Sequence, residues 1–286
     1  MKRIFLNSIF VLAIFWLFSC ERTIDVKLDQ GETLLAVDGW ITDENKQQSI
    51  RLSTTAPYFQ NGKPPAITDA IVTLSDSDGN TEQLTHAGNG IYNINQIEGI
   101  VGNTYKLQIR WQGETYEAQT EITPNVPQID SIVVKKEKRP NIPASKGEGY
   151  FLFYNGPENE GVGDNFRVKV YRNDSLMNRP DNIIIAEDQF VDGNYLSNLE
   201  LNNGDPFRVG DKLKVEVLSI TRDAFNFYNE LILQTQNGGL FANPPSNVRT
   251  NILNINPKGK KAVGYFGGAS VISMLGKIEG DGQVIK

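Results

Sequence analysis

The chain has 286 residues, of which 39% are hydrophobic and 22% charged, the composition of a globular protein with a substantial core. Lys2 and Arg3 lie in a segment that we expect to be removed, which leaves 26 of the 28 basic side chains against 34 acidic ones. Nucleic-acid binding needs grouped Lys and Arg side chains. The densest basic run, residues 135–139, is interrupted by Glu137, and we interpret it as a solvated linker. Nucleic acid is therefore not expected as a partner.

The chain contains one cysteine, Cys20, and one histidine, His86. A single cysteine cannot form an intrachain disulfide, and these two residues cannot supply the usual set of zinc ligands. His86 lies where a strand enters a glycine-rich turn, so we interpret it as an exposed turn residue rather than a catalytic base. The sequence also lacks the common nucleotide-binding, serine-hydrolase and zinc-protease motifs. We predict no catalytic residue, no metal site and no cofactor.

Residues 1–19 have the features of a secretory signal peptide: a basic start, a short apolar run and a small residue, Ser19, before the cleavage point. The uninterrupted apolar run covers only residues 9–18, whereas a membrane-spanning helix needs about 20 residues. The segment 17–20 (Leu-Phe-Ser-Cys) resembles a bacterial lipobox, in which the cysteine becomes acylated. We therefore interpret residues 1–19 as a lipoprotein signal peptide.

Cys20 is the predicted lipidation site. An unpaired thiol is a liability in an oxidising compartment, whereas a thioether-linked lipid is stable there. Each buried methylene of an acyl chain adds about 0.8 kcal/mol, so several chains hold a protein firmly on a membrane. Glu21 and Asp25 follow the cysteine, and acidic residues at this place resemble the surface-export signals of Bacteroidetes lipoproteins. We predict a lipid-anchored protein of the outer membrane, and the sequence leaves open whether the anchor places it at the cell surface or on the inner face.

The sequence pattern from Leu34 to Thr120 predicts short strands at intervals of 8–12 residues, with turn residues between them. Residues 105–111 alternate cleanly between apolar and polar, and Gln112-Gly113 form a tight turn into the next strand. The pattern looks like the transthyretin-like or Ig-like sandwiches of bacterial surface proteins. We assign an N-terminal β-sandwich domain to residues 20–126.

Prolines at 124, 127, 140 and 143 indicate a domain boundary or strand crossing near residue 127. We assign residues 127–286 to a second β-rich domain. The exception within it is an amphipathic helix near residues 222–237, whose apolar residues fall at helical spacing. Thr221 is the expected N-cap, and Asp223 favours the positive end of the helix dipole. The fold class is therefore mainly β.

Three oxygen-rich segments carry side chains that could hold calcium or perform acid–base chemistry. Residues 76–80 contain an Asp-x-Asp-Gly fragment, but the twelfth position of this calcium-loop pattern is Ala87 instead of the required Glu, so we interpret the segment as a hairpin turn. We prefer a simple loop for the second segment and a solvated loop for the third. The second contains Asp188, Asp192 and Asn194, and the third contains Glu158, Glu160 and Asp164.

Several segments together resemble one family. They are residues 35–43, 72–79, 102–107, 211–213 with 219–220, the helix with Phe227 and Tyr228, and residues 238–247 continuing to 264–266. With the lipobox cysteine, they are similar to the domain-of-unknown-function 4249 (DUF4249) lipoproteins of Bacteroidetes. Members are often encoded near TonB-dependent outer-membrane receptors. The resemblance implies an accessory role in uptake, and it implies no catalytic or binding residues.

Three functions remain open at this point. The first is a non-catalytic binding or assembly module that contacts a TonB-dependent receptor or captures its cargo, with the loop 239–248 as a candidate contact. The second is a free-standing adhesin or structural envelope protein. The third is a glycan hydrolase that uses a carboxylate pair such as Glu158 and Asp164, which would lie about 5–10 Å apart in a cleft.

Overall fold

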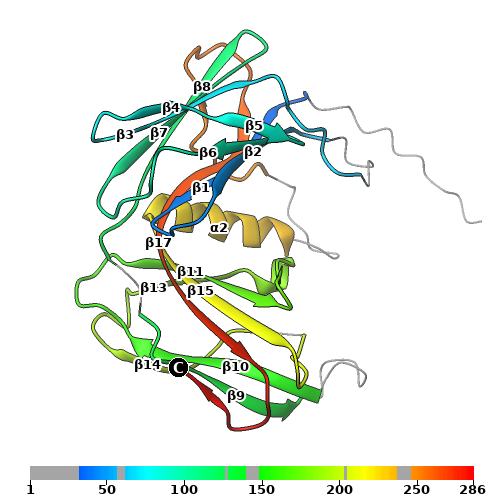
Figure 1. Ribbon diagram of the computed structural model, residues 1–286, viewed down its shortest axis with the longest axis vertical. Helices are drawn as coiled ribbons and strands as arrows, with labels where there is room; N and C mark the ends of the chain where they lie inside the picture. The colour runs from blue at the N-terminus through cyan, green and yellow to red at the C-terminus, as the bar shows by residue number, and fades with distance from the viewer. Residues whose placement is uncertain (1–31, 57–61, 126–127, 140–147, 203–204, 237–245) are drawn as a thin grey trace, which may run out of the picture. The chain divides into compact units, whose positions relative to one another are not determined.

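The structure, a computed structural model, describes residues 32–56, 62–125, 128–139, 148–202, 205–236 and 246–286 (Figure 1). The stretch from Thr33 to Lys286 forms one compact unit. It is mainly β, as predicted, and its described part contains one α-helix. No described helix is both long and apolar enough to cross a membrane. The signal peptide and Cys20 lie outside the described residues.

A nine-stranded sheet runs through the unit in the order β12-β11-β15-β17-β1-β2-β6-β5, with β13 paired to β11. Its strands come from both of the predicted domain ranges, 20–126 and 127–286. The strands are β1 (Leu35–Thr42), β2 (Gln48–Thr54), β5 (Thr85–Gly88), β6 (Ile91–Ile94), β11 (Asn165–Arg172), β12 (Ser175–Leu176), β13 (Ile184–Glu187), β15 (Lys212–Ile220) and β17 (Ala262–Lys277).

A five-stranded sheet of order β16-β8-β7-β3-β4 packs on the β1-β2-β6 part of the large sheet and forms the first sandwich. Strand β7 shows why the sequence folds this way: Tyr105, Leu107 and Ile109 point into the core, and the residues between them face outward. Each such side chain contributes about 1.5–3 kcal/mol when fully buried. The strands are β3 (Ile71–Asp76), β4 (Thr81–Gln83), β7 (Thr104–Trp111), β8 (Glu114–Glu121) and β16 (Leu253–Asn254).

A four-stranded sheet of order β14-β10-β9-β18 packs on the β11-β15 part of the large sheet and forms a second core. Leu152 of β10 and Ile132 of β9 meet Val215 of β15 there, and all three are fully buried. The strands are β9 (Ser131–Lys138), β10 (Glu148–Pro157), β14 (Tyr195–Glu200) and β18 (Val284–Ile285), and a short 3-10 turn, η2 (Pro180–Asn182), precedes β13.

Strand β17 connects the two halves of the large sheet. Its first half pairs in parallel with β1, from Leu35↔Ala262 to Thr42↔Ala269. Its second half pairs antiparallel with β15, up to Lys212↔Lys277. The coloured ribbon in Figure 1 follows this strand from β1 to β15. Strand β17 therefore lies beside both hydrophobic cores.

The helix α2 (Arg222–Thr235) is confirmed where the sequence predicted it. Thr221 caps its start by accepting a hydrogen bond from the Ala224 backbone N–H at 3.2 Å. Its apolar face covers the large sheet: the Tyr228 ring stacks on Trp40 of β1 with centroids 5.9 Å apart, and Phe227 stacks on Tyr265 of β17 at 4.8 Å. The predicted glycine end of the helix, at 238–239, lies outside the described residues.

The interpretation of residues 135–139 as a solvated linker was wrong. Lys135 to Lys138 continue strand β9 and pair with β10, from Phe151↔Lys135 to Glu148↔Lys138. The strand continues because its charged side chains pack on aromatic rings at the surface. The Lys135 ammonium lies 4.4 Å above the Phe153 ring, and the Arg139 guanidinium lies 3.6 Å above the Phe151 ring.

The close approach of β8 to β17 gives a direct test of the packing. A β-carbon on Gly268 would clash with the Glu121 carbonyl oxygen, whereas one on Gly280 would meet no atom within 4 Å. We expect Gly268→Ala to lower the free energy of unfolding by about 2 kcal/mol, the usual cost of overpacking, and Gly280→Ala to leave it nearly unchanged. Urea denaturation of both variants measures this, and equal stabilities would contradict the packing described here.

Candidate functional site

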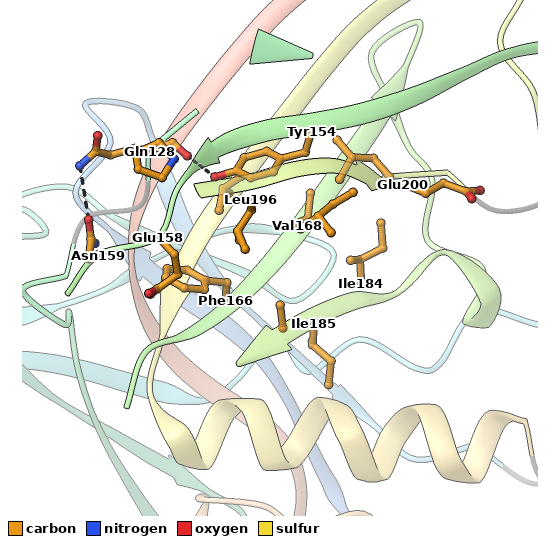
Figure 2. A pocket seen from close by; sticks show the side chains of 15 residues that line it. Gln128, Tyr154, Glu158, Asn159, Phe166, Val168, Ile184, Ile185, Leu196 and Glu200 are labelled. Atoms are coloured by element: carbon orange, nitrogen blue, oxygen red, sulfur yellow. Dashed lines mark hydrogen bonds between the residues drawn. The ribbon is translucent and has the colours of Figure 1, made fainter. Parts of the chain in front are cut away.

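An apolar pocket of about 270 Å³ lies between the four-stranded sheet and the β11-β13-β15 part of the large sheet. Figure 2 shows aliphatic and aromatic side chains pointing into it from both sides. Val168 of β11 and Val217 of β15 are cross-strand partners, so both side chains reach the same face of the sheet. The other lining residues are Gln128, Tyr154, Pro157, Glu158, Asn159, Phe166, Ile184, Ile185, Ala186, Leu196, Leu199, Glu200 and Leu201.

A few polar groups border this apolar lining. The Tyr154 hydroxyl donates to the Gln128 carbonyl oxygen at 2.6 Å, and the Gln128 side-chain amide donates to Asn159 at 3.3 Å (Figure 2). Burial raises the pKa of Tyr154 to about 12, so its phenol stays neutral and donates at physiological pH. Such a pocket, apolar with a few convergent polar groups, is the usual form of a small-molecule site.

Four carboxylates gather beside one end of the pocket, and we call them the acidic cluster: Glu158, Asp164, Asp188 and Asp192. Glu158 follows β10 and also lines the pocket, Asp164 precedes β11, and Asp188 follows β13. Glu158, Asp188 and Asp192 each offer an oxygen within 4.8 Å of the other two. The β11–β13 pairing and the β10–β14 pairing place these strand ends together, because Asn165 faces Glu187 and Pro157 faces Tyr195.

Backbone N–H groups from the facing loop hold three of these carboxylates in place. Gly193 donates to Glu158 Oε2 at 2.7 Å, Gly163 donates to Asp188 Oδ2 at 2.7 Å, and Gly161 donates to Asp192 Oδ1 at 2.7 Å. Gly161 and Gly163 adopt φ angles of +119° and +127°, a conformation that glycine reaches without steric cost. The loop glycines therefore orient their amides toward the carboxylates.

Three of the four carboxylates, those of Glu158, Asp164 and Asp188, are buried without compensating positive charge. Glu158 and Asp164 are only 6% and 5% exposed, and no described Lys or Arg forms an ion pair with either of them, Asp188 or Asp192. Burial raises the pKa of Glu158, and the nearby carboxylates add to the effect. Burial also raises the pKa of Asp164, against a hydrogen bond that its Oδ1 accepts from Asn125.

The structure brings together residues that the sequence placed in two separate loops. Glu158 and Asp164 join Asp188 and Asp192, while Asn194 contributes its backbone carbonyl, which accepts from the Glu158 N–H at 2.9 Å. Glu160 is exposed and stands outside the cluster. The sequence analysis missed the combination because it depends on strand pairing.

The other candidates from the sequence lie outside the acidic cluster. The turn at 76–80 satisfies its own polar groups, since Asp76 accepts from the Asp78 and Asn80 backbone N–H groups and from the Asn80 side chain. His86 is exposed on β5, with its ring 5.1 Å from that of Tyr92. Cys20 and most of the loop 239–248 lie outside the described residues, so their assignments stay predictions.

Comparison with known protein families agrees with the resemblance seen in the sequence. The family model described as "Domain of unknown function (DUF4249)" matches residues 21–274, which is most of the chain. This mainly β protein therefore belongs to the DUF4249 family. No curated protein matches the chain.

The raised pKa of Asp164 predicts the sign of a stability effect in metal-free buffer. A carboxyl whose pKa is higher in the folded than in the unfolded protein binds more protons when folded, so it favours the fold increasingly as pH falls from 7 toward its unfolded pKa. We expect Asp164→Asn to be more stable than the wild type at pH 7, with a difference that shrinks toward pH 4.

The control is Asp76→Asn, because the pKa of Asp76 is lowered by its hydrogen bond with Asn80. This carboxylate supports the fold above its unfolded pKa, and the support is lost as pH falls through the folded pKa. Asp76→Asn should therefore be less stable than the wild type at pH 7. Thermal melts of the wild type and both variants from pH 4 to 8 measure these differences in stability. If Asp164→Asn is less stable than the wild type at pH 7, Asp164 is not an uncompensated buried charge.

Proposed function

We propose that this protein is an outer-membrane lipoprotein, anchored through Cys20, that acts as a non-catalytic binding module accessory to a TonB-dependent uptake system. The lipobox-like segment 17–20 supports the anchor, and membership of the DUF4249 family supports the setting. The observation that carries the binding role is the apolar pocket between the two sheets. In this proposal the pocket receives an apolar part of the imported cargo.

The pocket is suited to binding because its walls come from two rigid sheets. Val168 and Val217 form one wall on adjacent strands, and Tyr154 and Leu196 form the other. Apolar surface removed from water contributes about 25 cal/mol per Å², so the lining supplies affinity. Tyr154, whose hydroxyl lies beside Gln128 at the border, supplies a polar contact that fixes orientation (Figure 2).

The carboxylates at the pocket border favour binding over glycan hydrolysis. A hydrolase needs one carboxylic acid at the leaving group and a second carboxylate at the sugar ring, both open to substrate. Glu158 and Asp164 are almost completely buried, and the Gly193 backbone amide already occupies Glu158 Oε2. A sugar would have to displace that contact before it could react.

The test is a mild-detergent pull-down of the tagged full-length lipoprotein from its own outer membrane, followed by mass spectrometry of the proteins and of extracted small molecules. We expect a stoichiometric TonB-dependent receptor and an apolar ligand. Ala186→Trp places a large side chain at the exposed rim of the pocket and should lose the ligand, whereas Ala87→Trp, on the exposed face of β5, should retain it. The Cys20→Ala variant should no longer be recovered in the membrane fraction.

Three results would overturn parts of this proposal. Recovery of the protein alone from intact membranes would favour a free-standing adhesin or structural envelope protein. The same ligand in wild type and Ala186→Trp would mean that the pocket is not the binding site. Turnover of a glycan by the purified protein would restore the hydrolase alternative.

A further inference from the structure

We propose that the acidic cluster is a calcium site, with Glu158, Asp188 and Asp192 as side-chain ligands. This inference stands apart from the proposed function, because it concerns a different ligand and does not depend on what fills the apolar pocket. Its first support is geometric: the three carboxylates come from two loops that are about thirty residues apart in sequence, yet each offers an oxygen within 4.8 Å of the others.

The second support is a pair of buried oxygen atoms that have no partner. Among the described residues, Glu158 Oε1 and Asp164 Oδ2 make no hydrogen bond, and both side chains are more than nine-tenths buried. Folded proteins leave few buried polar atoms unsatisfied, and an ionised carboxylate pays the largest penalty. Glu158 is one of the three proposed ligands, and its Oε2 already accepts a hydrogen bond from Gly193, so its unpartnered Oε1 is the atom that the cation would satisfy.

The chemistry of the ligands selects the ion. The site offers carboxylate oxygens and no sulfur or imidazole, which suits a hard cation and not zinc or copper. Calcium lies about 2.3–2.6 Å from its ligands, so oxygens on opposite sides of the ion are about 5 Å apart, in keeping with the observed spacing. Magnesium needs shorter distances and a stricter octahedron. Asp192 is exposed, which leaves room for water ligands.

The other Asp-rich segment of the chain shows what a loop without this role looks like. In the turn at 76–80, both oxygens of Asp76 accept hydrogen bonds from within the turn, and Asp78 accepts one from the Asn103 side chain. All of these contacts are exposed to water. The two loops have similar sequences of Asp, Asn and Gly, but only the acidic cluster combines burial, like charge and unpartnered oxygens.

A bound ion would join three strand ends. Glu158 follows β10, Asp188 follows β13, and Asp192 lies in the turn before β14. A calcium ion would replace mutual repulsion between these carboxylates by attraction to a common centre. It would therefore fix the loops 158–164 and 188–194 against each other at one end of the apolar pocket.

The test uses the full-length lipoprotein in detergent, stripped with EDTA and titrated at pH 7 with CaCl₂ or MgCl₂ while its melting temperature is recorded. Saturating calcium should raise the melting temperature by about 5 °C or more, and magnesium should raise it less. Asp192→Asn keeps an oxygen for the Gly161 N–H but removes the charge, so calcium affinity should fall at least about tenfold. The matched control, Asp78→Asn, should bind calcium as the wild type does.

The experiment distinguishes neutralisation of the acidic cluster by calcium from neutralisation by protons alone. If protons alone neutralise the acidic cluster, the EDTA-treated protein becomes more stable as pH falls, but calcium leaves the melting temperature at pH 7 unchanged, and the proposal is overturned. It is also overturned if Asp192→Asn and Asp78→Asn respond equally to calcium. Isothermal titration of wild type and both variants with CaCl₂ gives the same decision from heats of binding, without reference to thermal stability.

Discussion

The parallel pairing of β17 with β1 is the constraint on which the rest of the fold depends. The two strands are separated by more than 200 residues, yet eight consecutive residue pairs from Leu35↔Ala262 to Thr42↔Ala269 align them. Beyond Ala269 the same strand pairs with β15, so one polypeptide segment closes the first core and begins the second. Gly267 permits this arrangement because the Trp40 ring occupies the place of its side chain. The helix α2 then covers the junction through Tyr228 and Trp40.

The pocket and the acidic cluster follow from how the second core ends. The β11-β15 part of the large sheet and the four-stranded sheet pack through aliphatic side chains, and the apolar pocket lies where their packing opens toward β13 and β14. The connections between those strands are short and rich in Asp and Gly. They return to the same edge, which concentrates negative charge beside an apolar cavity. The sheets thus determine the shape of the pocket, and the loops that connect their strands supply the negative charge beside it.

The sequence predicted local features well because they depend on neighbours in the chain. The alternation of β7, the Thr221 cap and the start of α2 are local, and the structure confirms them. The charged end of β9 was wrongly interpreted because Lys and Arg at the edge of a strand can pack over aromatic rings, here Phe153 and Phe151, which composition alone does not show. Long-range pairing was beyond reach: no pattern in residues 262–270 indicates β1 as the partner.

The same distinction applies to the candidate site. Glu158, Asp164, Asp188 and Asp192 were each recognised as acidic loop residues, but their common environment arises from the pairing of β11 with β13 and of β10 with β14. Burial of the carboxylates, which separates this cluster from an ordinary solvated loop, is a property of packing. The pocket was not predicted at all, because it depends on how five strands, β10, β11, β13, β14 and β15, are divided between two sheets, which the sequence pattern does not show.

Hydrogen exchange measured residue by residue tests most directly whether β17 makes the two cores one structure. If β17 is shared as described, the slowest amides of β7 in the first core and of β10 in the second should exchange only through one global unfolding, with the same free energy and the same dependence on denaturant. Exchange of β10 at a distinctly lower free energy, while β7 stays protected, would show that the second core opens alone and would contradict the account.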